Sequence, residues 1–524
     1  MTSPSAADAM TKERDEGPPQ EGVEEKNGQI IDLGDGYSPE EEKEVLWKID
    51  LAIMPMMCFV FFLQYLDKQS LSYASVFGLI TDLDLTSTQY SWCSSIFYVG
   101  QLVSEYPFIY LMSRFHLTKF VGITVVIWGM ICMCLAAPNN YAGFAAVRFL
   151  LGFAEGAVSP AFITITGIWY RSNEHALRTA LWITMNGVAQ ICGSLLMYGI
   201  ARNTSLSLAP WRTLFLVCGA VTSAAGVMFY LFMPNGPKDA WFLTARQKQV
   251  LALRMAKDRE GGDKTSFSMA QLKEAALDIK TWFVFWFGVL VTMQSPVLTV
   301  RIQLRGVENF SNPLQFASLV INNIGYDKYE TMLYTAPTVQ GAVQIGMLWI
   351  GVCGCMLFPK NRTLVALVLI IPPLAGNVLL MKLSTDSGWG MIAASWISSC
   401  ITAVWSILLS LTASNVKGNT KRAIVNAMFF VGYCAGCIGA PQLWTKKPRY
   451  FNGVVTAIVT WCLLFAEIVA YRYLCARDNS KRDAALSNEQ NIVQESQGDV
   501  ILDASGAPDS DLTDKKDKQF RYSI

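Results

Sequence analysis

Charged residues are scarce in this chain of 524 residues. Asp, Glu, Lys and Arg make up 16% of it, whereas they make up about a quarter of a typical soluble domain. Hydrophobic residues make up 52% and the mean hydropathy is +0.31. The composition therefore excludes an ordinary soluble protein and predicts an all-α protein that crosses a membrane many times. The net charge of +1 gives no sign of a nucleic-acid partner.

Histidine is almost absent, and the 13 cysteines follow no metal-ligand spacing. Cys434 and Cys437, in CAGC, lie in a glycine-rich hydrophobic segment, where small residues favour helix packing in lipid. No arrangement of a nucleophile with a base is visible. We therefore expect no enzymatic activity and no metal or other cofactor. Basic residues are also few at the amino terminus, since residues 1–47 hold 13 Asp or Glu and 4 Lys or Arg. This excludes a signal peptide, which needs a basic start.

Twelve apolar runs approach the roughly 20 residues that a helix needs to cross the hydrocarbon core. They form two groups of six, at about 49–67, 89–111, 119–137, 141–166, 177–200 and 212–233, and at about 281–300, 331–357, 363–382, 388–412, 422–442 and 452–474. The chain thus divides into a disordered acidic cytosolic tail (1–47), a six-helix half (48–233), a cytosolic central loop (234–280), a second six-helix half (281–474) and a disordered cytosolic tail (475–524).

The central loop holds 9 Lys or Arg and 6 Asp or Glu. Within it, LTARQKQVLALRMAKD has apolar residues at helical spacing, which predicts an amphipathic helix on the cytosolic leaflet; a solvated linker is the alternative. In the first half, basic residues favour the loops on the side of the tails, as the positive-inside rule requires of cytosolic loops. The second half does not follow the rule. The expected outer loops contain two glycosylation sequons, at Asn203 and Asn309.

Five charged residues interrupt the apolar runs of the first half: Asp67, Lys68, Glu105, Arg148 and Glu155. A charge at the centre of a membrane helix costs about 2.5 kcal/mol or more, so such residues usually face a cavity and have a function. Arg148 and Glu155 are seven residues apart, which is two helical turns and therefore one face. A carboxylate in a low-dielectric cavity keeps its proton unless a cation lies close by. An anionic substrate that attracts this cation would make the carboxylate take up a proton, so the pattern favours a proton-coupled carrier over a plain salt bridge between helices.

Several motifs resemble one transporter family. Six plus six helices around a basic loop are typical of the major facilitator fold, with two pseudo-symmetric halves. YLDKQSLSYA, RFLLGFAEGAVSPAF and IWYRSNEHALRTA resemble the anion:cation symporter family of that superfamily. WRTLFLVCGAVTSAAG, MPNGPKDAWFLTARQ, SNVKGNTKRAIVNAM and KKPRYFNG resemble its fungal branch of allantoate permease-like carriers. The resemblance covers about residues 45–475. One departure is YLMSRFHLTKFVG, which lacks the Gly and the acid that the general superfamily motif places before the basic pair.

This resemblance implies roles for individual residues. Proton coupling falls on Asp67 and Glu155, with Arg148 as the basic partner, and Lys68 holds the anion where bacterial and animal members often have Arg. Lysine keeps the charge but lacks the bidentate fork of arginine. We expect further substrate contacts from seven residues: Tyr65, Asn186, Gln190, Gln340, Gln344, Asn377 and Trp405. We expect four residues to act in the cytosolic gate: Arg114, Lys119, Lys421 and Arg422.

The sequence therefore predicts a secondary transporter of the plasma membrane, with both termini in the cytosol and membrane lipid around it. It is expected to be a monomer that takes up a small organic anion with protons by alternating access. An exporter of an organic acid or secondary metabolite is the first alternative, although the helix at 177–200 has glycines without the proline of drug:proton antiporters. A non-transporting nutrient sensor is a more distant one, because such proteins usually have longer tails.

Overall fold

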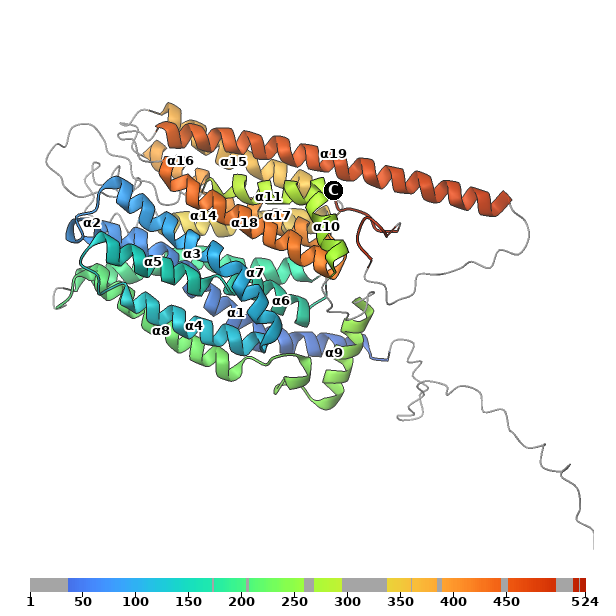
Figure 1. Ribbon diagram of the computed structural model, residues 1–524, viewed down its shortest axis with the longest axis horizontal. Helices are drawn as coiled ribbons and strands as arrows, with labels where there is room; N and C mark the ends of the chain where they lie inside the picture. Colours follow the sequence, from blue (N-terminus) through green and yellow to red (C-terminus); the bar gives the residue numbers. More distant parts are fainter. Residues whose placement is uncertain are drawn as a thin grey trace, which may run out of the picture.

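The computed structural model describes residues 36–171, 174–203, 207–258, 268–294, 337–359, 361–383, 389–443, 451–495, 512–517 and 519–524. Its regular elements are helices that run side by side along one long axis (Figure 1). The end with α2 (Leu79–Asp82) lies opposite the end with α9 (Ala245–Asp258) and α10 (Met269–Leu277). We call the latter the terminal end, because α1 (Pro39–Val76) begins there and the last residues of the chain return to it.

The first bundle comprises seven long helices and the short α2. Besides α1 it contains α3 (Ser87–Arg114), α4 (Leu117–Cys134), α5 (Tyr141–Glu155), α6 (Val158–Trp169), α7 (His175–Arg202) and α8 (Pro210–Phe232). Its core is one continuous hydrophobic cluster with large buried aromatic side chains, among them Trp128, Trp182 and Trp211. Burial of such rings contributes much of the packing energy, so the first bundle forms a unit with its own core.

The second bundle begins with a bent pair, α10 and α11 (Ile279–Thr292), which meet at 68°. It continues with α14 (Pro337–Leu357), α15 (Arg362–Lys382), α16 (Trp389–Ser398), α17 (Ile401–Ser414), α18 (Asn419–Leu443) and α19 (Phe451–Glu495). A second hydrophobic cluster fills its interior and includes Phe287, Phe429 and Trp461. The two clusters divide the described chain into two packing units.

Two helix pairs make the most extensive contacts between the described parts of the bundles. On one side α3 packs against α18, where the Ser95 hydroxyl donates to the carbonyl of Ile438 at 2.8 Å. On the other side α7 packs against α14, and their backbones approach closely because glycines face each other. A Cβ added to Gly341 would lie 2.6 Å from the carbonyl oxygen of Gly187, so larger side chains there would separate the helices.

Among the described residues, ten helices are long and apolar enough to cross a membrane, or eleven if the bent pair is one span. The chain is thus an all-helical membrane protein. The sequence predicted twelve spans, and α3 accounts for part of the difference. This helix of 28 residues covers the second predicted run, but its Ser, Gln and Tyr side chains make it less apolar than the ten.

The central loop differs from the sequence expectation. Its helix α9 does not present its apolar face to a lipid surface, because Val250, Leu251 and Met255 are buried in the first hydrophobic cluster. The Arg254 side chain is fully buried and forms ion pairs with Glu42 of α1, at 2.8 Å, and with Glu174. The amphipathic pattern was therefore real, but α1 and its neighbours cover the apolar face.

Both tails are also more ordered than predicted. The helix α1 starts at Pro39, nine residues before the predicted boundary, because Ser38 and Glu41 form a capping box. At the other end α19 continues to Glu495 and extends beyond the bundle (Figure 1). Residues 512–517 and 519–524 then dock on the second bundle, and Tyr522 joins its hydrophobic cluster. The composition of the tail did not reveal this docking, which depends on contacts between distant residues.

Candidate functional site

A cavity of about 210 Å³ lies between the two bundles. Residues of α1, α3, α5, α6 and α7 line it on one side, and residues of α11, α17 and α18 on the other. The lining includes Ser87, the first residue of α3, and Pro441, near the end of α18, so the cavity extends toward the α2 end. Its volume is below the 300–1,000 Å³ that is typical of drug-sized ligand pockets. The described cavity therefore suits a small molecule.

Lys68 of α1 provides a cation to this cavity. Its ammonium group forms an ion pair with the Glu155 carboxylate at 2.9 Å, with 15% and 0% of the two side chains exposed. Glu155 is the last residue of α5, and Gly156 and Ala157 keep helical backbone angles, so α5 and α6 form one span that carries the carboxylate beside α1. The sequence left open which nearby cation, an Arg or a Lys, would lie beside the carboxylate.

Arg148 lines the cavity close to Lys68. Its Nε donates to the Cys93 carbonyl at 3.3 Å, and its guanidinium carbon lies 5.4 Å from the centre of the Phe97 ring. The Lys68 ammonium lies 5.9 Å from the same ring. Both cations thus flank one aromatic face, which stabilises positive charge where water is partly excluded. Among the described lining residues these two are the charged ones, so the cavity surface is positive.

Asp67 faces away from the cavity. It is fully buried, and its Oδ2 accepts a hydrogen bond of 3.4 Å from the hydroxyl of Thr222 on α8. Adjacent residues on a helix point about 100° apart, and the unbroken course of α1 sends Lys68 into the cavity and Asp67 into the first bundle. The two charges of YLDKQSLSYA therefore occupy different environments.

A chain of hydrogen bonds crosses between the bundles behind the cavity. Gln190 Nε2 donates to the Tyr65 hydroxyl at 2.9 Å and to Gln344 Oε1 at 3.1 Å. The Thr402 hydroxyl donates to the same Gln344 oxygen at 3.3 Å. Tyr65 and Thr402 line the cavity, whereas Gln190 and Gln344 are buried behind them. The two glutamines, expected to contact substrate, instead connect α1 and α7 to α14 and α17.

The remaining residues that were expected to contact substrate fall into two groups. Asn186 and Trp405 line the cavity. Gln340 and Asn377 are buried outside the described lining, and the Asn377 amide donates to the carbonyl of Pro373 in its own helix at 2.8 Å. Asn377 belongs to α15, which contributes no described residue to the cavity, so its side chain makes its hydrogen bond within its own helix.

The four expected gate residues make contacts within their own bundles. Arg114 is exposed at the end of α3 and lies 5.6 Å from the Tyr110 ring, and Lys119 donates to the carbonyl of Tyr230 on α8. Lys421 pairs with three carboxylates of the second bundle and its tail, and Arg422 Nε donates to the Val416 carbonyl at 3.3 Å. None of these contacts joins the two bundles. Of the two sequons, Asn203 is exposed after α7, and Asn309 lies outside the described residues.

The sequence profile of the Major Facilitator Superfamily matches residues 57–441, which include all the cavity helices. The chain belongs to the Major Facilitator Superfamily. Members of this superfamily are transporters, not enzymes.

Relatives of known sequence extend over nearly the whole chain. The uncharacterized transporter C757.13 of Schizosaccharomyces pombe is 32% identical over 93% of this chain and 88% of its own length. The allantoate permease of Saccharomyces cerevisiae is 29% identical over 93% of this chain and 87% of its own. Among solved structures, a bacterial homologue of the human lysosomal transporter Spinster, inward-facing and unoccupied, covers 83% of this chain and 97% of its own. Its TM-score is 0.56 at 12% identity, so it supports the superfamily fold alone.

Sequence reasoning missed one face of this Major Facilitator cavity. Residues of α3 line it at helical spacing, with hydroxyl or amide groups among aromatic rings: Ser87, Tyr90, Ser91, Ser94, Phe97, Tyr98 and Gln101. These side chains are uncharged, so a search for embedded charges passed over them. The periodic polar residues in an otherwise apolar run were the signal that could have found them.

Proposed function

We propose that this protein is a proton-coupled carrier that takes up a small organic anion by alternating access. The observation that carries the proposal is the Lys68–Glu155 ion pair at a cavity with a positive lining. An anion that binds Lys68 competes with Glu155 for the ammonium group. The carboxylate, deprived of its cation in a buried site, then takes up a proton.

The proposal also covers the arrangement of the helices, the membrane and the substrate contacts. Twelve spanning helices would form two pseudo-symmetric six-helix halves that rock about the cavity, with both termini in the cytosol and the chain a monomer in the plasma membrane. The cavity, which extends toward the α2 end, would then face the outside, and Asn203 would be available for glycosylation. The similarity to an allantoate permease supports a carboxylate as the substrate, held by Lys68 and Arg148 and oriented by the hydroxyl groups of α3. Asp67, separate from the cavity, would serve as a second protonatable group inside the first bundle.

Uptake by cells that express the protein tests this function. Labelled carboxylates, with allantoate first, are offered at acidic and neutral external pH, with and without a protonophore. We expect uptake of at least one compound that is faster at acidic pH and lost with the protonophore. Uptake that ignores both treatments would contradict proton coupling, and no uptake by correctly localised protein would favour export.

The variant Glu155→Gln tests whether Glu155 carries the coupled proton. The amide keeps the shape of the carboxyl group but cannot exchange a proton, so we expect accumulation against a gradient to be lost while exchange of labelled for unlabelled substrate persists. Glu105→Gln is the matched control, because Glu105 is a buried carboxylate of α3 outside the described cavity lining. Full accumulation by Glu155→Gln would contradict the assignment.

A further inference from the structure

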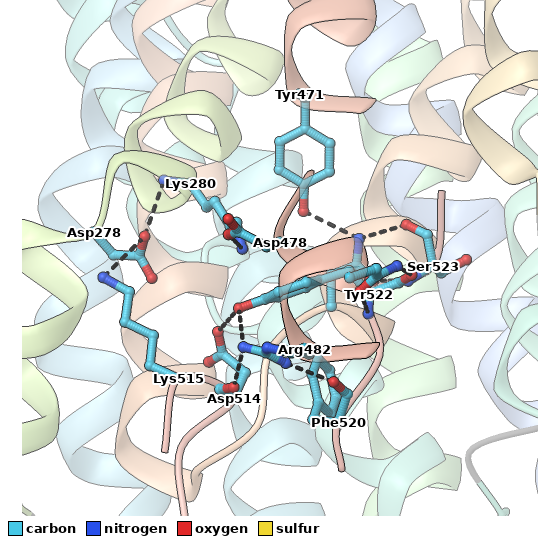
Figure 2. Close-up of polar contacts among 12 residues, drawn as sticks. Asp278, Lys280, Tyr471, Asp478, Arg482, Asp514, Lys515, Phe520, Tyr522 and Ser523 are labelled. Carbon is cyan, nitrogen blue, oxygen red and sulfur yellow. Dashed lines mark hydrogen bonds and ion pairs between the residues drawn. The ribbon is translucent and has the colours of Figure 1, made fainter. Parts of the chain in front are cut away.

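The last residues of the chain dock on the terminal end of the second bundle. We call residues 512–517 and 519–524 the strap. It contacts α10, the start of α11, the α17–α18 connection and α19, and Figure 2 shows its contacts with Asp278 and Arg482. Thr513, Asp514 and Tyr522 are almost fully buried there. The described part of the strap is therefore packed against the second bundle.

Charges of both signs match between the strap and its docking surface. Asp514 pairs with Lys421 at 2.8 Å and Asp517 with Lys417 at 2.6 Å. In the opposite sense, Lys515 pairs with Asp278 at 3.3 Å and Arg521 with Asp483 at 2.8 Å. A tail with charges of one sign would pair only with residues of the opposite sign on the docking surface. The alternation therefore fixes both the register and the direction of the strap.

Two asparagines hold the backbone of the strap from opposite sides. Asn479 of α19 accepts from the Tyr522 amide and donates to its carbonyl, each at 2.9 Å. Asn415, in the α17–α18 connection, does the same for Ser523, at 2.7 and 2.9 Å. Arg482 adds hydrogen bonds to the carbonyls of Asp514 and Phe520 (Figure 2). Each backbone group that the asparagines engage is thereby satisfied, as a buried peptide requires.

The docking surface has a direct connection to the cavity. Lys417 and Asn415 join α17 to α18, and these two helices carry Thr402, Trp405 and Tyr433 of the cavity lining. The other partners of the strap belong mainly to α10 and α19, which contribute no described residue to the lining. The strap thus ties the ends of two cavity helices to elements outside the cavity.

We propose that the strap is an autoinhibitory element: docked, it restrains α17 and α18, and released, it lets their terminal ends move. The restraint follows from the contacts alone, whereas its effect on transport rests on the proposed function. Release leaves the bundle folded, because the hydrophobic cluster of the second bundle consists mainly of helix residues. Opening of a peripheral segment below the global unfolding energy is a common form of local motion.

A charge exchange between Lys417 and Asp517 in the full-length chain tests the restraint. Hydrogen–deuterium exchange is followed in purified wild type, Lys417→Asp, Asp517→Lys and the double variant. Each single variant places like charges together, so we expect amide exchange of the strap and of the α17–α18 connection to rise about tenfold. The double variant restores opposite charges but not the hydrogen bonds that Asp517 accepts from the amides of Gln519 and Phe520, so exchange of both segments should fall clearly below that of either single variant. Lys516→Asp, at an exposed strap position, is the control for the charge change in Lys417→Asp.

Each outcome decides the proposal. Faster exchange that is confined to the strap, with α17 and α18 unchanged, would overturn the restraint, as would a double variant no better than the single ones. If the uptake experiment yields a substrate, the single variants should transport it at least twofold faster than wild type. Equal rates would overturn autoinhibition. If it yields none, the exchange data still report the restraint, so failure of the proposed function and failure of the strap remain distinguishable.

Discussion

At the scale of residues, two different environments accommodate the acid and the base that interrupt the first apolar run. Lys68 reaches the cavity and binds Glu155, whereas Asp67 turns into the first bundle toward Thr222. The sequence identified these charges correctly as unusual, because their cost in lipid is large. It could not assign their partners, since the partner of Lys68 depends on how the bundle brings α1 beside α5.

Replacement of Lys68 by Gln should weaken substrate binding strongly. A hydrogen bond to a charged group contributes about 1.5–3 kcal/mol, so we expect the Michaelis constant for the transported anion to rise tenfold or more. Lys48→Gln is the matched control: Lys48 also forms an ion pair with a glutamate, Glu44, at 2.9 Å, but 32% and 57% of the two side chains are exposed. Such exposed pairs contribute less than about 1 kcal/mol. Equal Michaelis constants for wild type and Lys68→Gln would show that Lys68 does not bind the transported anion.

At the scale of elements, helix contacts decide which residues face the cavity. The spacing of apolar residues predicted most helices of both bundles, and the polar stripe of α3 lowered its hydropathy because it lines the cavity. The sequence alone could not tell apart the roles of Gln190 and Asn377. Each is a polar residue in a membrane helix, yet Gln190 forms a hydrogen bond to the other bundle and Asn377 forms one to a carbonyl of its own helix.

The glycine contact between α7 and α14 provides a test at this scale. Gly187→Val and Gly341→Val should separate the two helices, because even a Cβ at either position would lie under 3 Å from atoms of the facing helix. We expect at least a tenfold loss of transport while the protein still reaches the membrane. Gly199→Val and Gly346→Val, on the same two helices with open space around them, should transport normally. The measurement is initial uptake rate per amount of surface protein.

The ion pairs of α9 provide a second test. Arg254→Ala removes the fully buried guanidinium that Glu42 and Glu174 share. Arg171 still pairs with Glu42 at 2.8 Å, so we expect a cost below the about 3–5 kcal/mol of a buried ion that loses its partner. We expect a clear fall in thermal stability of the purified protein. Arg246→Ala removes a largely exposed pair with Glu41 and should change stability by less than about 1 kcal/mol. An unchanged melting temperature for Arg254→Ala would show that α9 is not anchored through this arginine.

At the scale of the whole molecule, the sequence predicted the class of protein but not how its carboxy-terminal segment packs. Hydropathy and motifs identified a polytopic transporter, and the match to the Major Facilitator Superfamily confirms that class. The docked strap and the extension of α19 were not predictable, because they depend on pairs such as Asn415 with Ser523 that are 108 residues apart. Local patterns carry no information about such long-range contacts.

The central claim is that substrate and proton compete through the Lys68–Glu155 pair. The most direct measurement uses purified protein in proteoliposomes with a pH-sensitive dye inside and allantoate, or the anion found by the uptake screen, added outside. The account predicts that the anion acidifies the lumen in wild type and that Glu155→Gln exchanges the anion without moving protons. Anion entry without acidification in wild type, or equal acidification in both proteins, would contradict it.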